Sequence, residues 1–109
     1  MTYEIINPSD KCFIEAESDT VAALVGNALG SGYYGVRDEN GKPVLHVMQS
    51  VSEATNMTDD EISAFIGTHH REIRKAFESF HYATERTSLN NIGKMAAAYA
   101  RGMVAKYGV

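Results

Sequence analysis

The 109-residue sequence predicts an α+β fold: a small N-terminal antiparallel β-sheet with a short helix, followed by a C-terminal pair of long antiparallel helices. Two pairs of short β-prone runs, each joined by a turn-rich segment, predict the sheet. Two apolar stripes at helical spacing predict the helix pair. We expect one domain over 1–109, with a β-rich part at 1–57 and a helical hairpin at 58–109.

The first β-hairpin is expected at Tyr3–Ile6 and Lys11–Glu17. Between them, Asn7–Asp10 is a dense turn signal, because Pro restricts φ while Asn, Ser and Asp side chains bond to nearby backbone. Cys12 is the only cysteine, so an intrachain disulfide and a thiol-based zinc site are not expected. We interpret it as a small buried residue on the second strand.

A short buried helix is expected at 19–29, because Ser18 and Asp19 form a typical N-cap before an apolar-rich run. A second hairpin is expected at Tyr33–Arg37 and Val44–Met48. The Asn40-Gly41 dipeptide between these runs supplies the positive φ that tight hairpin turns need.

The first long helix is expected from about Asp59 to His81, after a capping box at Thr58–Glu61. Its apolar residues keep to spacings of three, four and seven, which defines one buried stripe: Ile62, Phe65, Ile66, Ile73, Ala76, Phe77 and Phe80. The second long helix is expected from Leu89 to Tyr107 after a polar turn near 84–88. Small residues beside its stripe, Gly93, Ala97 and Ala100, would let another backbone approach closely.

The charge balance argues against a nucleic-acid polymer as partner, because the formal net charge is −4 and a global positive field is absent. A local cationic pocket for a small anion stays possible. No apolar run approaches the ~18–20 residues that span a bilayer, so no membrane association is expected. The lone cysteine fits a reducing cytoplasm.

Catalytic and metal-binding patterns are weak in this sequence. His69 and His70 are adjacent and would point about 100° apart on a helix, so one half-buried and one solvated histidine are expected and no metal site. The acidic run Asp59–Glu61 suits the positive end of a helix dipole. Cys12 has no evident activating base, and nucleophile-elbow and phosphate-loop motifs are absent. We expect a binding protein without a cofactor, and not an enzyme.

Three features leave two interpretations open. The glycines and tyrosines of Gly30–Gly35 fit either a plain helix-to-strand connection or a loop that offers amides to an anion. Asn90, Lys94 and Arg101 share one strip of the last helix, which is either a solvated face or a phosphate-binding strip. Phe80 is either a core residue or the stacking wall of a cleft.

Several segments together resemble the first type of Thoeris anti-defence protein, a family of small phage-encoded sponges. These segments are Tyr3–Lys11, Ala28–Gly35, Glu78–Phe80 and Thr87–Gly93. The resemblance implies a non-catalytic protein in the host bacterial cytoplasm. Such a protein would sequester a cyclic ADP-ribose isomer, glycocyclic ADP-ribose, and so block activation of the Thoeris effector. It further implies a homo-oligomer, either a dimer or a hexamer, and allows cyclic oligonucleotides at a separate site.

The resemblance also implies a ligand site. Phe80 and Asn90 match the family's ligand-contacting Phe and Asn, and the loop after the short helix corresponds to a segment that lines the pocket. An arginine is expected to meet the pyrophosphate. The ligand-binding residues expected on this basis are Leu29, Gly30, Ser31, Phe80, Asn90, Asn91 and Arg101.

An alternative follows from the apolar helices with small-residue faces. A small helical protein-interaction module that inhibits a host protein would need the same amphipathic pattern. It would bind a protein surface and leave a small nucleotide untouched.

Overall fold

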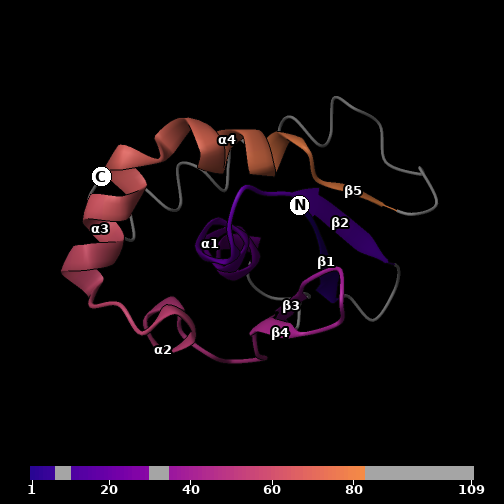
Figure 1. Ribbon diagram of the computed structural model, residues 1–109, viewed down its shortest axis with the longest axis horizontal. Helices are drawn as coiled ribbons and strands as arrows, with labels where there is room; N and C mark the ends of the chain where they lie inside the picture. The colour runs from indigo at the N-terminus through magenta and orange to yellow at the C-terminus, as the bar shows by residue number, and fades with distance from the viewer. Residues whose placement is uncertain (7–10, 30–34, 83–109) are drawn as a thin grey trace.

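The computed structural model describes residues 1–6, 11–29 and 35–82 (Figure 1). In chain order, the elements are β1 (Thr2–Ile6), β2 (Cys12–Glu15), α1 (Asp19–Leu29), β3 (Gly35–Arg37), β4 (Pro43–Leu45), α2 (Val51–Thr55), α3 (Asp59–Thr68), α4 (His70–Glu78) and β5 (His81–Tyr82). An N-terminal antiparallel sheet combined with helices confirms the α+β class.

The sheet has five strands in the order β4-β3-β1-β2-β5, and every neighbouring pair is antiparallel. β1 lies at its centre and shows the alternation of a half-buried strand: Tyr3 and Ile5 are fully buried, whereas Glu4 between them is half-buried. Tyr3 pairs with Ile14 and Ile5 with Cys12, which places all four on one face. Cys12 is buried on its strand, as predicted.

Both predicted hairpins are present. In the turn of the second, the Asp38 carboxylate accepts hydrogen bonds from the backbone N–H groups of Asn40 and Lys42, each at 2.9 Å. Gly41 takes a φ of 79°, the left-handed conformation expected of the Asn-Gly dipeptide. The second strand of this hairpin ends earlier than predicted, at Leu45, whereas Tyr33 and Tyr34 at the start of the first predicted strand lie outside the described residues.

Helix α1 has the bounds predicted for it, and it runs through the middle of the molecule (Figure 1). The sheet strands β3 and β4 contact it on one side and α2 and α4 contact it on others. Because neighbours lie all round, residues 21–26 are buried without a polar face. At Gly26 the helix approaches β3 closely, because a Cβ there would overlap Cγ2 of Val36.

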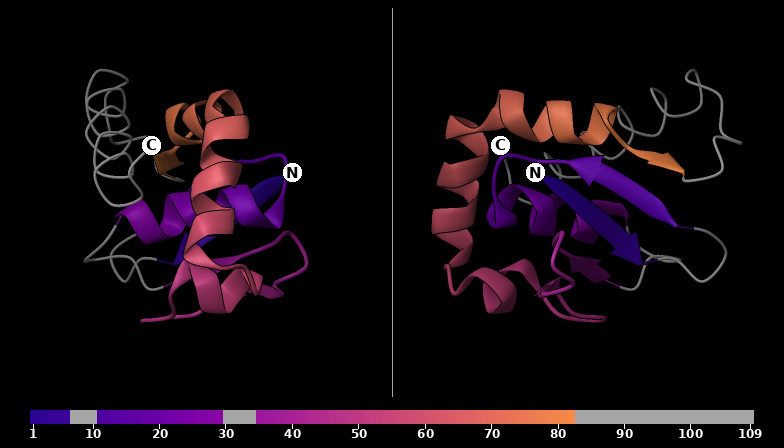
Figure 2. Two further views of the ribbon diagram at one scale, coloured as in Figure 1. Left: turned by 90° about the vertical axis from the view of Figure 1, so that its left-hand side faces the viewer. Right: turned by 45° about the vertical axis from the view of Figure 1, so that its right-hand side comes forward.

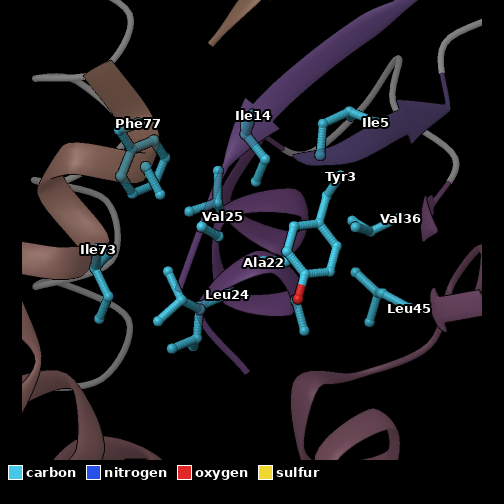
Figure 3. Packing of buried hydrophobic residues seen from close by; sticks show 14 of the residues in the cluster. Tyr3, Ile5, Ile14, Ala22, Leu24, Val25, Val36, Leu45, Ile73 and Phe77 are labelled. Atoms are coloured by element: carbon cyan, nitrogen blue, oxygen red, sulfur yellow. The ribbon is translucent and has the colours of Figure 1, made fainter. Parts of the chain in front are cut away.

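One hydrophobic core surrounds α1 (Figure 3). On the sheet side, Tyr3, Val36 and Leu45 face the helix. On the other side, Ile73 and Phe77 of α4 close the core, and both are less than 5% exposed. The core therefore joins the sheet to α4 through α1.

The prediction of one continuous helix from Asp59 to His81 is wrong. The helix starts at the predicted capping box, in which Thr58 Oγ1 accepts from Glu61 N at 3.2 Å and Glu61 accepts from Thr58 N at 3.0 Å. It stops at Thr68, and His69 adopts φ −109° and ψ 27° before α4 begins. Figures 1 and 2 show α3 and α4 meeting at a corner. The corner lets α4 turn back over α1 and β2, with Ile73 and Phe77 buried.

The predicted end of this helix at His81 is also wrong. α4 ends at Glu78, and His81 and Tyr82 form β5 on the edge of β2. Ser79 stabilises the exit, since its hydroxyl accepts from Glu15 N at 2.8 Å and donates to Ala76 O at 2.7 Å. The pairing partner of β5 is distant in sequence, which is why helical periodicity did not reveal the strand.

The second long helix, predicted at Leu89–Tyr107, lies outside the described residues. The polar segment before α3, for which no element was predicted, contains α2, and Ser50 caps it by accepting from Glu53 N at 3.1 Å. Among the described residues, no helix has the length and apolar character needed to cross a membrane.

Candidate functional site

Two residues of the predicted ligand site lie among the described residues, one at the end of α1 and one beyond the end of α4. Phe80 lies two residues beyond the end of α4, after Ser79, and the residue is 3% exposed and belongs to the hydrophobic core. Leu29 is the last residue of α1. Because α1 packs against α4, the two residues lie at or beyond the ends of elements that contact each other. A ligand role for either residue stays a prediction.

The other predicted site residues lie outside the described residues: Gly30, Ser31, Asn90, Asn91 and Arg101. The same holds for Lys94, which shares the polar strip with Asn90 and Arg101, and for most of the glycine-rich segment after α1. Gly35, at the end of that segment, is buried at the start of β3. Its Cβ would lie 2.5 Å from the backbone oxygen of Leu45, so close packing of β3 and β4 accounts for this glycine.

A second cluster of functional groups lies at the corner between α3 and α4. Glu17, in the connection from β2 to α1, places a carboxylate oxygen 3.3 Å from Nδ1 of His69. Glu72, in the first turn of α4, brings a third potential ligand atom, and the three atoms lie within 4.8 Å of one another. We call Glu17, His69 and Glu72 the corner cluster.

The His69 ring stacks on the ring of Phe65. Its centroid lies 4.1 Å from that of Phe65, with an angle of 25° between the two planes. Phe65 is one turn earlier on α3, and its backbone oxygen accepts from His69 N at 2.8 Å. Stacking and the backbone bond together limit the orientations of the imidazole. His70, the neighbouring residue, is exposed, which confirms the prediction that the two histidines meet different environments.

Two further polar pairs serve the fold. The buried Tyr3 hydroxyl donates to Asp19 Oδ1 at 2.7 Å. The pKa of the phenol is raised mainly by burial and, to a smaller extent, by this hydrogen bond. On β3, Arg37 donates to both carboxylate oxygens of Glu4, at 3.2 and 3.0 Å. These bonds and the negative charge of Glu4 raise the pKa of the Arg37 guanidinium. The first pair joins β1 to α1 and the second joins β1 to β3.

Sequence reasoning missed the corner cluster. His69 and Glu72 are three residues apart, a spacing that places two side chains on one helix face, so part of the signal was present. Glu17 comes from a distant segment of the chain, and only the packing of α1 beside α4 brings it near His69.

No family model matches the sequence, and neither curated proteins nor solved structures gave a match. The function is therefore argued from the residues of this chain.

Proposed function

We propose that the protein binds a cyclic ADP-ribose isomer, glycocyclic ADP-ribose, and holds it without degrading it. Sequestration would block activation of the Thoeris effector in the cytoplasm of a bacterial host. The observation that carries the proposal is the combination of four segments that resemble the Thoeris anti-defence sponges. Three of them reach into the described structure, and two of these three lie at elements in contact, because Leu29 ends α1, Phe80 lies two residues beyond α4, and α1 packs on α4.

The ligand chemistry suits the predicted residues. An adenine ring stacks well on an aromatic side chain, and an asparagine amide both donates and accepts hydrogen bonds to a base or ribose. A pyrophosphate is best met by an arginine, whose planar group makes two parallel charge-assisted bonds, and by the amides of a glycine-rich loop. Asn90, Arg101 and Gly30–Ser31 would supply the hydrogen-bonding and charged groups, and Phe80 is the aromatic residue that the resemblance implies.

The burial of Phe80 limits the part that this residue can take in ligand recognition. A ring that is 3% exposed offers little of its face to a ligand. We therefore assign Phe80 to the floor of the pocket, and we assign recognition of the ligand to Asn90 and Arg101. In this proposal, pockets form between protomers of a homo-oligomer, either a dimer or a hexamer, because a shared pocket can enclose most of a rigid cyclic ligand. A separate site for cyclic oligonucleotides belongs to the same proposal.

A depletion experiment tests the proposal. The purified protein is mixed with glycocyclic ADP-ribose in slight deficit, the mixture is filtered, and the retained complex is heat-denatured. We expect the ligand to disappear from the filtrate and to return intact after heating. A sponge needs an affinity near the nanomolar range, which corresponds to about −12 kcal/mol. Free ligand in the filtrate, or a hydrolysed product after heating, would refute sequestration.

A charge-matched pair of variants locates the site. Arg101→Ala should weaken ligand binding at least about 100-fold, because it removes the charge-assisted bonds to the pyrophosphate. Arg71→Ala removes the same charge from an exposed position on α4 and should leave the affinity unchanged. Equal affinities for the two variants would show that the pocket is misplaced. Phe80→Ala is a poor test, because loss of core packing would accompany any loss of binding.

A protein-interaction module is the second candidate, and one described feature favours it. In the turn after β4, the Val47 side chain is 52% exposed and that of Met48 is 97% exposed. Met48 also takes a φ of 63°, which costs energy for a residue with a side chain. On this alternative the protein gives no calorimetric signal with the nucleotide. It would instead inhibit a host protein, and Val47→Ser with Met48→Ser would abolish that inhibition.

A further inference from the structure

We propose that the corner cluster binds a divalent transition-metal ion of the zinc type. One imidazole and two carboxylates converge there from two segments that are distant in the sequence. Nitrogen and oxygen ligands of this kind suit zinc and the neighbouring first-row ions.

The distances between donor atoms fit such an ion. When metal–ligand bonds measure about 2.0–2.1 Å, two ligands in a tetrahedral arrangement lie about 3.3–3.4 Å apart. Nδ1 of His69 and Oε1 of Glu17 are 3.3 Å apart. All three donor atoms fall within 4.8 Å of one another, so a change of side-chain torsion in Glu72 brings the third ligand to the same spacing.

The surrounding structure preorganises two of the three ligands. The His69 ring is stacked on Phe65, and the residue ends α3 with its backbone bonded to Phe65. Glu17 follows Ala16, which is 6% exposed. The Ala16 N–H donates to Met1 O at 2.9 Å, so the hydrogen bonds between the first two strands continue past the end of β2 and fix the backbone just before Glu17. Less conformational entropy is lost when ligands are held in place before the ion binds.

Charge and access point to a cation with an open coordination position. As metal ligands, two carboxylates would contribute two negative charges and an imidazole none, and a divalent ion neutralises this charge. The Glu17 and His69 side chains are 46% and 35% exposed, so the ion is reached from solvent, and water can complete its coordination. The soft thiolates that select copper(I) are absent from the cluster.

Binding would link two parts of the fold. Glu17 lies in the connection between β2 and α1, whereas His69 and Glu72 belong to the corner that starts α4. An ion shared between them binds the folded chain and not the unfolded one, so it raises the melting temperature.

Cobalt and zinc titrations of the full chain, after treatment with a chelator, test this site. We expect one Co²⁺ per chain with the visible absorption bands of a low-coordinate site. Saturating Zn²⁺ should raise the Tm by about 5 °C or more. His69→Gln should weaken zinc binding at least about 100-fold, because it removes one of three ligands. Glu17→Gln and Glu72→Gln should also weaken it.

His70→Gln is the matched control, because His70 is the next residue, is exposed and lies outside the cluster. It should bind zinc as the parent protein does. Circular dichroism and the Tm in excess chelator establish that each variant is folded. If His69→Gln does not fold, Glu17→Gln takes its place in the comparison. Equal zinc affinity for the parent, His69→Gln and Glu17→Gln would overturn the proposal, as would the absence of stoichiometric binding. None of these measurements involves a nucleotide, so the result stands apart from the proposed sponge function.

Discussion

The sheet side of α1 and the corner between α3 and α4 differ in how their residues are buried. Towards the sheet, Tyr3, Ile5 and Val36 are fully buried, and the helix backbone approaches β3 at Gly26. Towards the corner, α3 buries only Ile62 and Ile66, and Glu17 meets His69 where both side chains are partly exposed. Buried apolar contacts dominate the free energy of folding, whereas exposed polar contacts add little. Apolar burial around α1 therefore fixes the fold, and the corner has polar groups left for binding.

The largest expected effect comes from the residue that couples the two sides. Phe77, on α4, is 2% exposed in the core around α1. Phe77→Ala should lower the free energy of unfolding by about 3–5 kcal/mol, because it removes buried surface and leaves a cavity. Urea denaturation measures this. The neighbouring Glu78→Ala, at an exposed position, is the control and should change stability by less than about 0.5 kcal/mol. Similar losses for both variants would contradict the assignment of Phe77 to the core.

Two glycines compare the sides directly. Gly26→Ala should destabilise the protein by about 1–3 kcal/mol, because the new methyl group overlaps Val36. Gly67→Ala, on α3, meets no atom within 4 Å and should stabilise the protein by up to about 1 kcal/mol through its helix propensity. Thermal unfolding should thus shift in opposite directions. Changes in Tm of the same sign for both variants would mean that Gly26 and Gly67 are equally closely packed.

The Tyr3–Asp19 bond predicts a pH dependence on the sheet side. Burial and the bond raise the pKa of Tyr3 in the folded state above its ordinary value near 10. The folded protein thus favours the neutral phenol, so this stabilisation is complete below pH 10 and is lost as the pH rises above it. Tyr3→Phe should cost about 1 kcal/mol at pH 7. It should also reduce the loss of stability between pH 9 and pH 11, measured by urea denaturation. If the free energy of unfolding falls equally steeply with pH in Tyr3→Phe and in the parent protein, Tyr3 is not the source of this pH dependence.

The smallest effect is expected at the corner cluster in the absence of metal. Glu17→Gln in excess chelator should lower stability by less than about 1 kcal/mol, because the pair with His69 is partly exposed to solvent and screened. Denaturation at low and high salt measures the difference. A loss comparable to that of Phe77→Ala would show that the contact between Glu17 and His69, and not apolar packing, holds the corner.

The parts of the fold that depend on local interactions could be predicted. The bounds of α1, the capping box at Thr58 and the Asn40-Gly41 turn follow from hydrogen bonds and φ preferences between residues close in sequence. The apolar stripe from Ile62 to Phe80 was also predicted, and all of its residues are buried except Phe65, which is partly exposed.

The direction of the chain at His69 could not be predicted in the same way. An apolar stripe at a period of 3.6 residues is compatible with a straight helix and with two helices that meet at a corner, because periodicity specifies a face and not an axis. The corner is stabilised by the burial of Ile73 and Phe77 against α1 and β2. Likewise, β5 needs an edge of β2 to pair with, and that edge belongs to a distant segment.

By itself, the sequence determined the fold class, the position of α1, the two hairpins and the start of α3. The predicted ligand site at Asn90 and Arg101 rests on sequence resemblance alone. Tertiary structure decided that Phe80 is buried in the core, that the long helix bends at His69, and that Glu17 joins His69 and Glu72. The physical reason is the range of the interactions: caps and turns join neighbouring residues, whereas a cluster of side chains from separate elements exists only after those elements have packed.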